Sequence, residues 1–162
     1  MNAKDSARRI DVGCQPSPSG AGEILIQACE GDAFLTFFAM STVLNAHGKY
    51  DDLGRAVVHI KGLIQSKFGY PNDEAFPGHP LSGRGFDGCG IFEVVGGSWM
   101  RELIAQNKVA FPSTGDSWEC RHFIFPFKEH VFECLARDIE VTCTRDGTKS
   151  ILLKFVDEIL RD

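Results

Sequence analysis

The segment from Arg121 to Ala136 has the most regular pattern in the chain and limits most strongly what the chain can fold into. Phenylalanine recurs at every second position up to Phe127, and turn-forming chemistry follows at Lys128-Glu129. Because side chains in a strand alternate between two faces, a two-residue turn here predicts an antiparallel hairpin with Phe125 opposite Phe132. The phenylalanine rings then share one face, which we expect to be part of the core.

Other segments extend this hairpin into a sheet. Strands are predicted at 23–29, 33–40, 55–61, 91–95 and 139–144, where β-forming residues are bounded by turn residues. Ser98 is expected to cap a short helix that ends near Asn107, and apolar residues with helical spacing predict a C-terminal helix over 151–160. The sum is an α+β, β-rich fold of about seven strands, mainly antiparallel and sandwich-like, with one short internal helix and one amphipathic C-terminal helix.

The two parts of the chain differ in composition. Residues 1–22 are rich in Ser, Pro, Gly and charge, so we expect a flexible lead-in, followed by a single globular domain over 23–162. No apolar run in this lead-in suits a signal peptide, and none elsewhere reaches the length of a membrane span. A cytoplasmic location with reduced cysteines is the resulting expectation.

The charge of the chain bears on its partners. A net charge of −5 with scattered Lys and Arg makes nucleic acid an unfavourable partner, because phosphate binding needs clustered cations. An acidic surface would suit a basic protein, and a small-molecule ligand is equally compatible with the sequence. No cofactor motif is present, and the sequence does not decide the oligomeric state.

Cys120, His122, His130 and Cys134 offer the ligand types that zinc prefers. The hairpin register argues against a metal site, because Cys120 and His122 lie on one face and the other two lie with the phenylalanines. We therefore predict no metal here.

The same register makes His122 and Glu133 diagonal neighbours on the face opposite the phenylalanines. A carboxylate beside an imidazole is suited to acid–base chemistry. A solvent-facing pair of charges across two strands is the more ordinary occupant of such a face, and we expect that arrangement.

The stretch 69–90 holds three of the seven prolines and six glycines, and it interrupts the strand pattern. Long irregular loops in compact domains are often functional, although a self-satisfied surface loop remains an open alternative. Its polar residues give the candidate site. Ligand contacts are expected from Asp73, Glu74, His79 and Arg84, and the weaker catalytic candidates are His79, Asp87, Cys89, His122 and Glu133.

Two functions follow from these patterns. The first is a binding or regulatory domain that recognises a protein or a small ligand through the 69–90 loop. The alternative is a small hydrolase or transferase that uses His79 with Arg84 and Asp87, with or without a metal ion. The sequence leaves open whether the protein is an enzyme.

Overall fold

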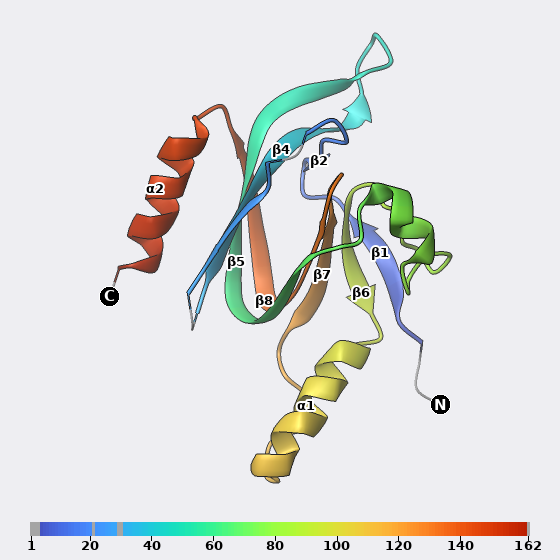
Figure 1. Cartoon of the computed structure of the whole chain (residues 1–162), viewed down its shortest axis with the longest axis vertical. Helices are drawn as coiled ribbons and strands as arrows, with labels where there is room; N and C mark the ends of the chain where they lie inside the picture. Colours follow the sequence, from blue (N-terminus) through green and yellow to red (C-terminus); the bar gives the residue numbers. More distant parts are fainter. Residues whose placement is uncertain (1–3, 21, 29–30, 162) are drawn as a thin grey trace.

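The structure is a computed structural model that describes residues 4–20, 22–28 and 31–161 (Figure 1). Two α-helices, one short 3-10 helix and eight strands make up this part of the chain. The strands are β1 (Ser6–Ile10), β2 (Gln15–Pro16), β3 (Ile24–Gln27), β4 (Ala33–Leu44), β5 (Tyr50–Gly69), β6 (Ile91–Val95), β7 (Arg121–Pro126) and β8 (Val131–Thr144). The helices are η1 (Asp73–Gly78), α1 (Ser98–Ala110) and α2 (Thr148–Ile159).

The eight strands form one antiparallel sheet in the order β1-β6-β7-β8-β5-β4-β2, and β3 also pairs with β4. Two contacts show that the sheet is strongly curled: the ring centroid of Phe37 on β4 lies 5.4 Å from that of Phe127 and 6.3 Å from that of Phe125. Since β5 and β8 separate β4 from β7 in the sheet, these contacts cross the core from one half of the sheet to the other. The β-rich α+β fold predicted from the sequence is confirmed.

The phenylalanine hairpin has the predicted register. Phe125 pairs with Phe132, Phe123 pairs with Cys134, and the Phe127 amide donates to the His130 carbonyl over 2.8 Å. The side chains of Phe123, Phe125 and Phe132 are fully buried, so this face is the centre of the core. Strand β8 then continues without a break through the segment 139–144 that the sequence pattern separates from it.

The expectation of a flexible lead-in is wrong for residues 6–16. Strand β1 pairs with β6 over five residues, and Cys14 is almost completely buried in the core. The charged residues that suggest solvation have partners: Arg8 donates to the distant Glu93, and Arg9 donates to the nearby Gln15. Charged side chains of this kind are typical of an edge strand.

Helix α1 also begins and ends differently from the prediction. Gly97, in the left-handed region at φ +65°, precedes the helix, and Ser98 is its first residue. The Asp5 carboxylate accepts from both the amide and the hydroxyl of Ser98, so the residue just ahead of β1 supplies the capping group that the local sequence lacks. Asn107 lies inside the helix, which continues to Ala110.

Helix α2 packs beside β3 and β4, at the left of the view in Figure 1, whereas α1 lies at the bottom. Its buried residues Ile151 and Phe155 contact Phe34, whose ring stacks on Phe155 at 4.9 Å. This confirms the predicted amphipathic C-terminal helix. Within the described residues, no helix combines the length and apolarity that crossing a membrane requires. Cys29 and Glu30, at the end and the turn of the predicted first hairpin, lie outside the described residues.

An ion network holds β1, β6 and β7 together. Glu93 accepts hydrogen bonds from Arg8 at 2.6 Å and from Arg121 at 2.9 and 3.0 Å. The bonds from Arg121 outweigh the opposing effect of burial and, with those from Arg8, lower the pKa of Glu93 to about 2. A carboxylate whose pKa is lowered by folding stabilises the fold above its unfolded pKa, and this contribution is lost as the pH falls toward the folded value.

We therefore expect the wild type to lose more stability than Glu93→Gln when the pH falls from about 6.5 to about 3. The difference should be about 1 to 2 kcal/mol in unfolding free energy, after allowance for the exposed side of the network. Urea unfolding at both pH values measures it. Equal losses in the two proteins would show that this network does not carry the acid dependence.

Candidate functional site

A cleft of about 540 Å³ lies on the outer face of the sheet, between the 69–90 loop, the start of α1 and the residues ahead of β1. The loop is held there by Phe76, Leu81 and Phe86, which pack on apolar side chains of β1, β6, β7 and β8. The Ala7 amide also donates to the Arg84 carbonyl over 2.8 Å. The loop is therefore a docked element of the fold, as Figure 1 shows in green beside β1 and β6.

A carboxylate between two imidazoles lies at this cleft. Glu133 Oε2 is 2.7 Å from Nε2 of His122, and Oε1 of the same carboxylate is 3.7 Å from Nε2 of His79. The exposed fractions of the side chains are 8% for His122, 6% for His79 and 20% for Glu133. The contact between His122 and Glu133 confirms their predicted proximity. The expectation that the pair faces solvent is wrong, because the loop and α1 cover this part of the sheet.

The charge state of Glu133 follows from these contacts. Burial alone would raise the pKa of this carboxyl, but the hydrogen bonds to His122 and His79 outweigh burial and lower the pKa to about 2. Glu133 is therefore ionised at neutral pH, accepts from Nε2 of His122 and lies at ion-pair distance from Nε2 of His79. Nδ1 of His79 accepts from the Leu81 amide at 3.2 Å, which leaves the proton of a neutral His79 ring on Nε2, toward Glu133.

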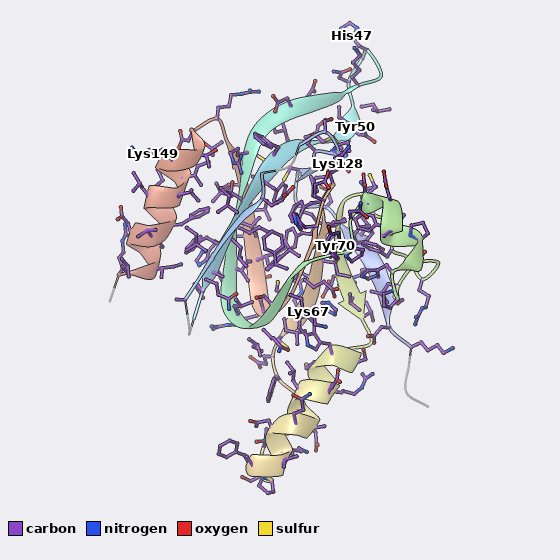
Figure 2. The ribbon with its side chains drawn as sticks, in the orientation of Figure 1. His47, Tyr50, Lys67, Tyr70, Lys128 and Lys149 are labelled. Atoms are coloured by element: carbon purple, nitrogen blue, oxygen red, sulfur yellow. The ribbon has the colours of Figure 1, made fainter. Side chains whose placement is uncertain are left out.

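Four cationic side chains line the cleft: Lys4, Lys67, Arg84 and Arg101. Arg84 donates to the carbonyls of Asp5 and Pro80, and Arg101 donates to the carbonyl of Gly96. The ammonium of Lys67 lies 3.9 Å from the centre of the Trp99 ring, close to the start of α1 (Figure 2). None of the four forms an ion pair with a carboxylate in the part of the chain that the structure describes.

A second hollow of about 570 Å³ is lined by Asp32, Lys61, Arg121, Arg137 and Asp138, and it differs from the cleft in its electrostatics. Most of its charged groups are paired: Arg121 binds Asp138, Asp32 lies 2.6 Å from His59, and Lys61 pairs with a neighbouring carboxylate. Arg137 is the one lining cation without an ion pair among the described residues, against four in the cleft. Charges that are already paired offer little to a charged ligand. The cleft beside Glu133 is therefore the stronger candidate site.

The structure brings together only some of the residues that the sequence singles out. His79, Arg84, His122 and Glu133 line the cleft. Asp87 accepts from the Cys89 amide at 2.9 Å, and Cys89 lies near Arg9 and Gln15 at another place on the surface. Asp73 and Glu74 are exposed in the first turn of η1 and do not line the cleft.

The four possible zinc ligands of the hairpin do not share a site. His122 faces the outer cleft, Cys134 is fully buried in the core, and the His130 ring contacts Phe68 at 5.6 Å between centroids. Across residues 4–20, 22–28 and 31–161, no three side chains of His, Cys, Asp or Glu are grouped so that they could hold a metal ion.

Several cleft residues escape a reading of the sequence. Lys4 and Asp5 belong to the segment expected to be flexible, and Lys67 and Arg101 resemble ordinary surface charges. In the structure, Lys67 of β5 is the cross-strand partner of Glu133 and faces the same side of the sheet. Identifying that pair requires the β5–β8 register, which no local pattern specifies.

Comparison of the chain with protein-family models, with curated proteins and with solved structures finds no match.

Proposed function

We propose that this protein binds a small anionic molecule in the cleft, with the 69–90 loop supplying part of the binding surface. The observation that carries the proposal is the set of four cations that line the cleft without a carboxylate partner among the described residues. Among the described residues, Arg84 and Arg101 donate only to neutral backbone carbonyls. Their positive charge therefore remains available to an anion.

The charge balance of the cleft supports this proposal. Its lining has four cations and three carboxylates, which gives a local charge of 4 − 3 = +1 with neutral imidazoles, whereas the whole chain has a charge of −5. One of the carboxylates, Asp5, already accepts from Ser98. A locally positive cleft in an acidic protein favours an anion over a cation.

The hydrolase or transferase alternative is less well supported by the geometry. A general acid or base must reach the substrate with a free ring nitrogen. Both nitrogens of His79 have partners, and Nδ1 of His122 is buried. Asp87, the expected third member of that site, is engaged with Cys89 outside the cleft. Binding is therefore the function that we propose.

Titration calorimetry with sulfate and inorganic phosphate at low ionic strength tests the proposal. We expect saturable binding to the wild type, and a loss of about ten-fold or more in affinity for Arg84→Gln and for Lys67→Gln, because each removes an unpaired cation from the cleft. Lys67→Gln is included because Lys67 makes no hydrogen bond in the described part of the chain that could stabilise the loop.

Arg145→Gln is the matched control. Arg145 also donates to a backbone carbonyl, that of Asp52, but it does not line the cleft. Its substitution changes the net charge by the same amount and should leave the affinity unchanged. Absence of binding to the wild type would overturn the proposal, and so would an equal loss of affinity in the control.

A further inference from the structure

His122 has one ring nitrogen that the folded structure leaves unused. Its Nε2 faces Glu133 at 2.7 Å, whereas its Nδ1 is buried and has no hydrogen-bond partner among the described residues. Buried polar atoms in proteins nearly always have a partner, so each exception calls for a physical explanation. This one belongs to a side chain that lines the cation-rich cleft and is 8% exposed.

We propose that an anion binds in this cleft together with one proton, which His122 takes up at Nδ1. This inference rests on the proposed function and adds its regulation by pH. The proton on Nε2 stays directed at Glu133, and the positive charge that the ring gains beside the cleft attracts the anion. Imidazole is the side chain that ordinarily gains a proton between pH 8 and pH 5, so the coupling falls in that range.

His79 is not suited to the same role. Its Nδ1 already accepts from the Leu81 amide, and a proton there would oppose the N–H that now points at it. Its Nε2 proton is directed toward Glu133. Protonation of His79 would therefore cost a hydrogen bond that positions the loop, whereas protonation of His122 breaks none.

The charged groups around His122 come from every neighbouring element. They are Glu133 on β8, Lys67 on β5, Arg101 and Glu102 on α1, Arg84 in the loop, and Lys4 with Asp5 ahead of β1. Proton uptake by His122 neutralises the adjacent Glu133 charge and raises the local charge from +1 to +2. An incoming anion favours this form for the same reason, so anion and proton strengthen each other's binding.

Sulfate is the probe of choice, because its charge does not change between pH 5 and pH 8. Linkage of one proton to one anion limits the gain to ten-fold in affinity per pH unit. We expect sulfate to bind about ten-fold more tightly at about pH 5.5 than at about pH 8. Calorimetry in buffers of different ionisation enthalpy should count about half a proton taken up per sulfate near the midpoint, as a ten-fold total gain requires.

Three variants assign the effect. His122→Gln keeps an N–H for Glu133 but cannot titrate, so it should bind sulfate at all pH values with the wild-type affinity of about pH 8. His79→Gln should keep the pH dependence, and so should His47→Gln at the distant hairpin tip (Figure 2). Proton counting on the wild type tests the coupling even if a variant does not fold.

The outcomes separate the two proposals. No sulfate binding at any pH would overturn the proposed function. Binding that does not change with pH, or binding without proton uptake, would overturn only the coupling. A pH dependence that survives His122→Gln and disappears in His79→Gln would show that the proton is on the other imidazole and contradict the assignment.

Discussion

Gly85→Ala is expected to lower the unfolding free energy by about 3 kcal/mol, and to lower the melting temperature by about 10 °C. Gly85 has φ +91°, and a Cβ added there would overlap the carbonyl oxygen of Ala7 on β1. Neither backbone can yield without breaking the Ala7–Arg84 hydrogen bond that docks the loop. Thermal melting measures the stability, and faster tryptic cleavage after Arg84 would report loop detachment.

Gly83→Ala is the control for this variant. Gly83 has φ +73°, so alanine there is strained by a comparable backbone conformation, but no atom of the described part of the chain lies within 4 Å of the added Cβ. Its expected cost is about 1 kcal/mol. Equal and small effects of the two substitutions would mean that the loop does not lie against β1 as the structure places it.

Glu133→Gln is expected to cost about 2 to 3 kcal/mol of unfolding free energy at neutral pH. The ionised carboxylate accepts from His122 and faces the His79 ring at 3.7 Å, whereas an amide offers one accepting oxygen and presents an NH2 group to one of the two rings. Urea unfolding measures the loss. The same variant removes a negative charge from the cleft, so the protein that remains folded should bind sulfate more tightly.

Glu140→Gln is the matched substitution on the same strand. Glu140 pairs with Lys61 and has a side chain that is 60% exposed, so its loss should cost less than about 0.5 kcal/mol. If Glu133→Gln is as mild as Glu140→Gln, then the Glu133 carboxylate is hydrated and does not organise the two imidazoles.

Short-range patterns predicted the centre of the fold well. The alternation around Phe125 and the turn at Lys128-Glu129 specify a hairpin register, and that register correctly places His122 near Glu133. Alternation over 55–61 likewise predicts the buried row of Ala56, Val58 and Ile60. Such patterns depend only on which side of a strand a residue occupies, and they are therefore readable in a single sequence.

Long-range contacts account for what the sequence did not reveal. Strand β1 has an ordinary polar composition, and its order depends on Glu93 and on a loop more than seventy residues away. The docking of that loop changes the surroundings of His122 from solvent to a buried site. Lys67 and Arg101 become neighbours of one cleft only through the β5–β8 register and the position of α1.

The most direct test of the account is nitrogen-15 NMR of the imidazole rings near pH 7.5, with and without sulfate. We predict that His79 and His122 both hold their proton on Nε2, and that these ring protons exchange slowly with solvent because they face Glu133 in a buried site. Added sulfate should shift both sets of signals while those of His47 stay unchanged. Fast-exchanging ring protons on His79 and His122, with signals that sulfate does not move, would contradict it.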